Sequence, residues 1–233
     1  MKKTITTLIL VAAMGCSQSG QKNNSTLEKI DTTIECNNSV QFGDIDICLP
    51  IIDGMTECYS TPNVKEWTNK NKYGDNLILA FYLNYANYKQ VDKLDQIKFD
   101  DFFQIYGVDG LRGVKVGQSK FNKMAKDIEG NYIKENWADL VKGFEQNYDD
   151  LSIGRPVIIE SYSPNSKVRT YVMLIKVQYE NSEFVSIVTL NLIQIKERII
   201  FMLYTKNYNG EESIKKAKSK NDYSIALLMD ENQ

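Results

Sequence analysis

The chain has 233 residues, a formal net charge of −2 and no histidine. Its length suits one large domain or two small ones, and its nearly neutral charge argues against a nucleic-acid partner. Without histidine, the chain lacks the side chain best suited to proton transfer near neutral pH, which excludes Ser-His-Asp and Cys-His catalysis and histidine-based zinc sites. Chemistry carried by carboxylates, lysine or tyrosine remains open.

The start of the chain has the three parts of an export signal. Two lysines follow the initial methionine, residues 5–13 form a short apolar run, and small Gly15 precedes Cys16. The apolar run is too short to cross the hydrocarbon core of a bilayer, about 30 Å thick, as a mature helix. We therefore predict a signal peptide over residues 1–15.

The segment 13–16, Ala-Met-Gly-Cys, resembles the lipobox of bacterial lipoproteins. In that family the cysteine is acylated and becomes the first residue of the mature chain, and two or more acyl chains, such as palmitate, give stable membrane anchoring. The resemblance implies lipidation of Cys16, and Ser17 in place of aspartate implies sorting to the outer membrane of the cell envelope. The small residues before the cysteine would also suit the general signal peptidase, and the alternative is therefore a soluble periplasmic protein.

A polar segment follows the proposed anchor. Residues 16–39 are mainly serine, glutamine, asparagine, threonine and lysine, with few apolar side chains. Such a composition cannot bury enough apolar surface to fold by itself. We predict a flexible tether over residues 16–39, followed by a single folded domain over residues 40–233.

Three further cysteines allow a disulfide, because an exported protein meets oxidising conditions. Cys48 and Cys58 are the closest pair in the sequence, so they are the first candidates for a bridge, which would leave Cys36 unpaired. The alternative is that all three are small buried apolar side chains without a bridge.

The first half of the domain contains strand signals followed by a helical signal. Apolar residues alternate over 42–49 and predict a strand that ends at Pro50, and the run 76–88 predicts a longer strand. From 121 to 144 apolar residues recur every three to five positions, which predicts a central helical segment. Gly130 and the asparagine after it interrupt this pattern and predict a break or kink.

The last third predicts a four-stranded antiparallel meander and a closing helix. Four runs rich in Val, Ile, Tyr and Phe are separated by short polar breaks, and connections this short join only antiparallel neighbours. Glu211 and Glu212 then stand at the start of a helix with lysines behind them, an order that complements the helix dipole. The four runs cover residues 156–162, 168–179, 184–195 and 199–208.

Together these elements predict an α+β domain in which an antiparallel sheet is covered by the central helical segment and a C-terminal helix. Their order resembles the PsbP/Mog1-like fold, in which an early strand ends in a Leu-Pro step, as at Leu49 and Pro50, and a meander runs into a final helix, as over residues 204–214. The resemblance covers about residues 40–230. It implies a protein that binds partners or assists the assembly of larger complexes, and it implies no shared reaction.

Tyrosines at the ends of two predicted strands are candidates for a partner surface. The chain has 14 tyrosines, and exposed tyrosines favour recognition because they offer a large contact area with a polar tip. The alternative is that they are half-buried side chains of the sheet. The candidates are Tyr82, Tyr85, Tyr88, Tyr204 and Tyr208.

A loop punctuated by glycine spans residues 107–117. Backbone N–H groups in such a loop can cradle an anion, and Arg112 and Lys115 add positive charge, so the loop is a candidate anion site. Its spacing matches neither a P-loop nor a dinucleotide-binding motif. The alternative is a connector rich in turns.

No spacing of acidic residues assigns a proton donor and acceptor, and no motif indicates a metal or cofactor, so we assign no catalytic residue. We predict a membrane-anchored envelope lipoprotein that binds a protein partner or assists assembly without catalysis. One alternative is an immunity lipoprotein that neutralises a toxin. Two others are a carboxylate-dependent hydrolase of envelope glycans and a binder of a small ligand in a hollow between the sheet and the central helical segment.

Overall fold

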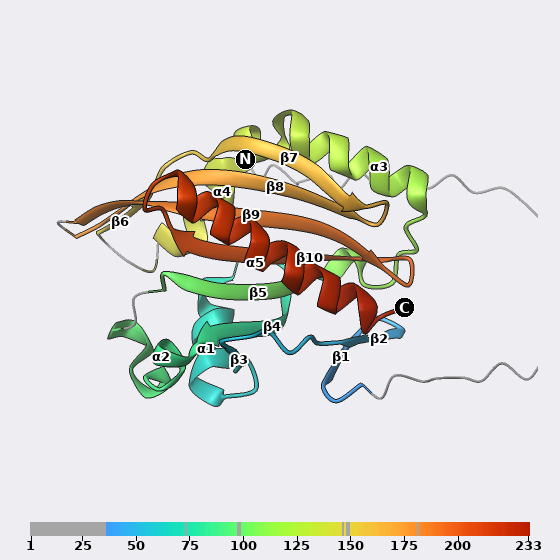
Figure 1. The fold of residues 1–233 in the computed structure, drawn as a ribbon, viewed down its shortest axis with the longest axis horizontal. Coiled ribbons are helices and arrows are strands. Elements are labelled where there is room, and N and C mark those ends of the chain that lie inside the picture. Colours follow the sequence, from blue (N-terminus) through green and yellow to red (C-terminus); the bar gives the residue numbers. More distant parts are fainter. Residues whose placement is uncertain (1–35, 73, 97–98, 146, 148–149, 181) are drawn as a thin grey trace, which may run out of the picture. The chain divides into compact units, whose positions relative to one another are not determined.

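The computed structural model describes residues 36–233 except positions 73, 97–98, 146, 148–149 and 181 (Figure 1). The predicted signal peptide, Cys16 and most of the predicted tether lie outside the described residues. They stay predictions. No helix within the described ranges is long and apolar enough to cross a membrane.

An antiparallel sheet forms the centre of the domain. Its strands are β3 (Met55–Glu57), β4 (Asn76–Asn84), β5 (Asp101–Val108), β6 (Leu151–Ile153), β7 (Val157–Asn165), β8 (Val168–Tyr179), β9 (Ser182–Ile195) and β10 (Arg198–Asn207). Among the described residues these eight strands have the order β3-β4-β5-β10-β9-β8-β6, and β7 pairs with β8 along the same edge as β6. A separate hairpin consists of β1 (Ser39–Phe42) and β2 (Ile45–Cys48).

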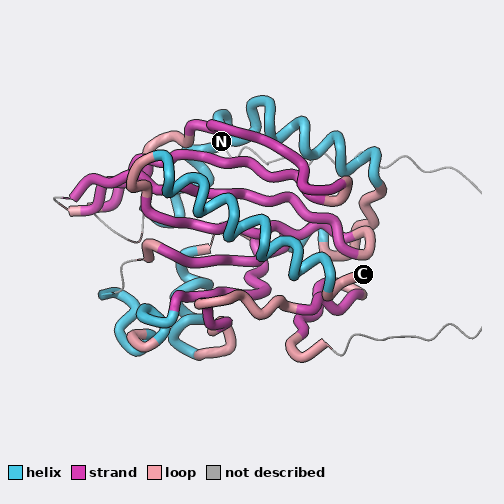
Figure 2. The backbone as a smooth tube through the Cα atoms, in the orientation of Figure 1, coloured by secondary structure: helices cyan, strands magenta, loops and turns pink. Residues whose placement is uncertain are grey.

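Helices cover both faces of this sheet, as Figure 2 shows in cyan beside the magenta strands. They are α1 (Pro62–Asn71), α2 (Tyr85–Tyr88), η1 (Val91–Gln96), η2 (Asp109–Leu111), α3 (Gln118–Asp127), η3 (Ile128–Tyr132), α4 (Ile133–Glu145) and α5 (Glu211–Asp230). On one face α5 lies across β9 and β10 (Figure 1). On the other face α3 packs Phe121 against Leu192, and α1 packs Val64 against Phe81.

The predicted α+β class is confirmed, and so is the C-terminal meander. β7 pairs with β8, β8 with β9 and β9 with β10, all in antiparallel register, and β10 leads into α5. Alternating apolar residues and short turns are sufficient to specify this arrangement locally. The central helical segment divides at the predicted break, because η3 separates α3 from α4 and contains Gly130.

One predicted strand extends too far. The pattern over 76–88 predicted a continuous strand, whereas β4 ends at Asn84 and α2 begins at Tyr85. The side-chain oxygen of Asn84 accepts a hydrogen bond of 2.9 Å from the backbone N–H of Asn87, which caps the start of α2. This local hydrogen bond ends the strand even though the apolar alternation continues.

The β1–β2 hairpin is fastened to the sheet by close packing and by an ion pair. The ring of Phe42 lies where a side chain at Gly107 would stand, so only glycine fits at that position of β5. Gly43 turns the hairpin with a φ of +67°, a conformation that glycine adopts without strain. Next to it, Asp44 binds the guanidinium of buried Arg198 at 2.5 Å. The β1–β2 hairpin, the first folded element after the predicted tether, is thus held at its turn by the ion pair and on its core side by the packing of Phe42.

The structure corrects the predicted disulfide. Cys36 is joined to Cys48, with Cα atoms 5.5 Å apart. Cys58 is a free, buried thiol that donates to the carbonyl oxygen of Phe81 at 3.2 Å, and burial raises the pKa of this thiol to about 12. The Cys48–Cys58 prediction is therefore wrong. Cys58 packs in the cluster between α1 and β4, whereas Cys48 ends β2, so closeness in sequence does not bring the two together.

Buried side-chain amides join α5 to the sheet. Asn191 on β9 donates from Nδ2 to Oδ1 of Asn221 on α5 at 2.7 Å and to the carbonyl oxygen of Met202 at 2.9 Å. Oδ1 of Asn221 also accepts from Thr189 at 2.7 Å, and Thr170 donates to Asn191 at 2.8 Å. Both asparagines and both threonines are 0% exposed, so no water replaces a lost partner. The network fixes the position of α5 on the sheet.

Replacing Asn221 by alanine is expected to lower the free energy of unfolding by about 2–4 kcal/mol, because the buried hydroxyl of Thr189 loses its acceptor and Nδ2 of Asn191 keeps only the carbonyl oxygen of Met202. Urea denaturation followed by circular dichroism measures this change. Ser219→Ala, on the exposed side of the same helix, is the matched control and should change stability by less than about 0.5 kcal/mol. Equal stabilities for the two variants would contradict the role of the network.

Candidate functional site

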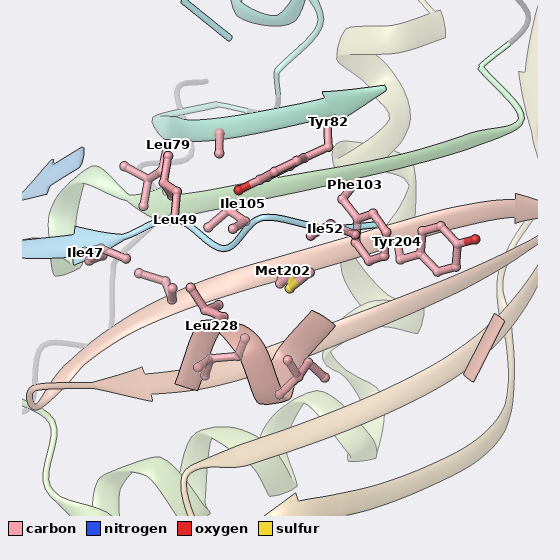
Figure 3. Packing of buried hydrophobic residues seen from close by; sticks show 14 of the residues in the cluster. Ile47, Leu49, Ile52, Leu79, Tyr82, Phe103, Ile105, Met202, Tyr204 and Leu228 are labelled. Carbon is pink, nitrogen blue, oxygen red and sulfur yellow. The ribbon is translucent and has the colours of Figure 1, made fainter. Parts of the chain in front are cut away.

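Two of the five tyrosines predicted to form a partner surface lie in the core. Tyr82 and Tyr204 are each 1% exposed, and Figure 3 shows both among the apolar side chains of the main cluster. The hydroxyl of Tyr82 donates to the carbonyl oxygen of Pro50 at 3.1 Å. Burial raises the pKa of both phenols. The prediction is wrong for these two residues because their strand positions point into the core.

The other three tyrosines do not form one surface. Tyr85 is 60% exposed, and Nζ of Lys89 lies 4.3 Å from the centre of its ring. Tyr88 is half-buried against the cluster under α1, whereas Tyr208 is half-buried against the main core. Of the five predicted tyrosines, only Tyr85 keeps the exposed ring that recognition requires.

The loop predicted to bind an anion makes its contacts within the chain. Nε of Arg112 lies 3.3 Å from a carboxylate oxygen of Asp109, and Nζ of Lys115 lies 4.0 Å from one of Glu197. The backbone N–H of Val116 donates to the carbonyl oxygen of Glu197 at 2.8 Å. The loop therefore docks on the β9–β10 turn, which favours the alternative prediction of a structural connector.

A shallow groove lies between α3 and the turn that joins β7 to β8. Its volume is about 670 Å³, and a second hollow of about 550 Å³ continues along α3. Polar side chains predominate on both walls. The wall on α3 presents Gln118, Asn122 and Lys126, and the opposite wall presents Ser163, Asn165 and Ser166.

The π-helical turn η3 brings Glu129 into this groove. Turns of this kind are rare and often occur at functional sites. Nη2 of Arg169, on β8, donates to both carboxylate oxygens of Glu129 at 2.8 Å, and the hydroxyl of Ser161, on β7, donates to the same carboxylate at 2.5 Å. Arg169 also donates to the oxygen of Ser161 at 3.0 Å. Glu129, Arg169 and Ser161 are thus hydrogen-bonded to one another, and these bonds join η3 to β7 and β8.

These contacts keep Glu129 ionised. The hydrogen bond from Ser161 and the positive charge of Arg169 lower the pKa of Glu129 below its usual value of 4.5, although partial burial acts in the opposite direction. A carboxylate in this state has no proton to donate at neutral pH, and both of its oxygens already accept hydrogen bonds. The arrangement therefore suits positioning and binding. Among the described residues, no group of three or more His, Cys, Asp or Glu side chains can hold a metal ion.

The residues that line the groove form no sequence motif, so the groove was not predicted. Glu129 and Arg169 are 40 residues apart, and they meet because the β7–β8 hairpin lies beside α3. The single local signal was the break at Gly130, which predicted a kink without indicating what the kink positions.

The sequence matches no protein-family model and no curated protein. The chain is similar in structure to PsbP of the cyanobacterium Synechocystis sp. PCC 6803, with 10% identity and a TM-score of 0.40 over 78% of this chain and 84% of that one. It is also similar to the Ran-binding protein Mog1p of Saccharomyces cerevisiae, with 10% identity and a TM-score of 0.29 over 84% of this chain and 92% of that one. The likeness concerns the fold alone.

The lowered pKa of Glu129 gives a testable dependence of stability on pH. A carboxylate whose pKa is depressed by folding stabilises the native state above its unfolded pKa and loses that contribution as pH falls through the folded value. The wild-type protein is therefore expected to be more stable than Glu129→Gln at about pH 7, with a difference that fades below about pH 4.5. Urea denaturation across this range measures the difference.

Glu135→Gln, on the exposed surface of α4, is the matched control for loss of one negative charge. A difference between wild type and Glu129→Gln that stayed the same down to about pH 3 would contradict the pairing of an ionised Glu129 with Arg169.

Proposed function

We propose that this chain is a membrane-tethered envelope protein whose domain binds a protein partner through the groove beside α3, without catalysing a reaction. The observation that carries the proposal is the groove itself. It is open, eight of its ten lining residues are polar or charged, and its one lining carboxylate, Glu129, is held by Arg169 and Ser161. Side chains that are fixed before a partner arrives lose less conformational entropy on binding, so such a site is preorganised for recognition.

Two features support the proposed location in the cell envelope. The first is the leader, with its lipobox-like ending at Cys16. The second is the disulfide between Cys36 and Cys48, because such bonds persist in oxidising compartments such as the periplasm. The 20 peptide steps from Cys16 to Cys36 allow a reach of roughly 65–70 Å when fully extended. A lipidated chain would therefore keep its domain near the membrane while it searches for a partner.

The alternatives differ in how well the groove supports them. A glycan hydrolase needs two carboxylates about 5–9.5 Å apart, and Glu129 is the only carboxylate among the residues that line the groove. Sites for small ligands are usually enclosed and lined mainly by apolar side chains, whereas this groove is open and eight of its ten lining residues are polar or charged. The immunity lipoprotein is a special case of the proposed function in which the bound partner is a toxin.

Acylation and partner capture test the proposal. Full-length, C-terminally tagged protein expressed in its native envelope is expected to incorporate labelled palmitate and to retain a stoichiometric partner after extraction in mild detergent. Cys16→Ala should lose the label, leave the membrane fraction and lose most of the partner. Ser17→Ala, at the next position, is the matched control and should behave as wild type in all three respects.

The two parts of the proposal fail separately. Unlabelled wild-type protein in the soluble periplasmic fraction would contradict the lipid anchor. Acylated, intact wild-type protein that retains no partner would contradict the binding module.

A further inference from the structure

Two lysines at the groove are, among the described residues, without the carboxylate contacts that some other lysines of the domain make. On the opposite face of the sheet, for example, Lys218 binds Glu160 at 2.6 Å. Lys123 and Lys126 line the two hollows of the groove, and within the described part of the chain neither has a carboxylate within 4.0 Å. Asp127 is the one acidic side chain on α3. The positive charge of this helix is therefore available to a partner.

Arg169 adds a third cation that the domain neutralises only in part. Its Nη2 is engaged by Glu129, whereas its Nη1 makes one long contact of 3.4 Å to the hydroxyl of Ser163. Nη1 therefore keeps donor capacity, and the residue lines the groove with 22% of its side chain exposed. Three cations and one carboxylate line the two hollows, a net charge of +2, in a chain whose net charge is −2.

The polar groups beside these cations match a peptide backbone. Nε2 of Gln118 donates to Oδ1 of Asn122 at 3.0 Å, and Oδ1 of Asn165 accepts from the backbone N–H of Lys167 at 2.8 Å. Oε1 of Gln118 and the Nδ2 groups of Asn122 and Asn165 remain to pair with the N–H and C=O groups of a peptide backbone. Nε2 of Gln118 donates across the groove to the carbonyl oxygen of Ser166 at 2.6 Å. This bond joins the two walls at that end of the groove, so an extended segment would lie over the bond to contact both walls.

Two other kinds of anionic partner fit the groove less well. A glycan would need an exposed aromatic face to pack on, and the aromatic residue of the groove, Phe121, is 3% exposed. A lipid surface calls for exposed large apolar side chains next to the basic ones. Such side chains, Ile51 and Val157 among them, do not line the groove.

We propose that the groove beside α3 binds an extended acidic segment of the protein partner, with Lys123, Lys126 and Arg169 contacting its carboxylates. This inference rests on the proposed function, because it specifies the chemistry of the partner that the module holds. Glu129 and Ser161 fix the guanidinium plane of Arg169, so that Nη1 meets a carboxylate without further ordering of the side chain. Exposed charges of this kind govern the rate of association and its salt dependence.

Fluorescence anisotropy with a labelled ten-residue peptide of alternating glutamate and serine tests the inference on the full-length protein in detergent. The acidic peptide is expected to bind more tightly than the same peptide with glutamine in place of glutamate, and to weaken as salt rises from about 50 to about 300 mM. Reversing both lysines, Lys123→Glu with Lys126→Glu, should weaken binding about tenfold or more.

The matched control is Lys215→Glu with Lys216→Glu, which makes the same change in net charge on α5. An equal loss in both double variants would overturn the inference, because it would show that overall charge governs binding. No preference for the acidic peptide would also overturn it. So would lysine-dependent binding seen only with phosphatidylglycerol vesicles or only with heparin.

The inference fails separately from the proposed function. If the Lys123→Glu and Lys126→Glu variant still captures the envelope partner at wild-type yield, the groove is not the binding site, although the tethered binding module stands. If the partner is lost with this variant and kept with the α5 variant, both are supported.

Discussion

Side-chain amides buried under α5 impose the constraint on which the rest of the domain depends. An asparagine at position 191, in the middle of an apolar sheet face, is costly unless it finds hydrogen-bond partners. Asn221 supplies them only when α5 lies in one register on β9, because both amides and Thr189 must meet at once. Apolar contacts such as those of Ala217 and Leu228 add free energy but little direction. The polar network selects the register, and the apolar contacts supply the stability.

The register of α5 determines the position of the proposed binding groove and of the point where the proposed tether joins the domain. On one side, Lys218 binds Glu160 of β7, the strand that leads into one wall of the groove. At the C-terminal end, the side-chain amide of Asn232 accepts from the backbone N–H of Cys48 and donates to its carbonyl oxygen, both at 2.8 Å. Cys48 carries the disulfide to Cys36, where the described chain begins. Contacts of α5 and the residues that follow it thus hold both the strand that leads into the groove wall and the point where the proposed tether joins the domain.

Features that depend on neighbouring residues could be predicted, and features that depend on distant pairing could not. Short turns between runs of strand-forming residues predicted the meander, and the order of charges from Glu211 onward predicted the closing helix. β5 escaped prediction because its pairing with β10 spans about 100 residues. Tyr82 and Tyr85 look alike in the sequence, yet the cap at Asn84 places one in the core and the other in solvent. The groove needs Glu129 and Arg169 together, and only the folded sheet and helix bring them into contact.

Backbone hydrogen exchange tests the central claim, that the partner binds the groove beside α3, most directly. It compares the full-length acylated protein alone with the same protein bound to its captured envelope partner. The account predicts slower exchange in the complex over α3 and over residues 161–169, with α2 unchanged. Protection confined to α2 and the exposed Tyr85, with exchange at α3 and the β7–β8 turn unaltered, would contradict it.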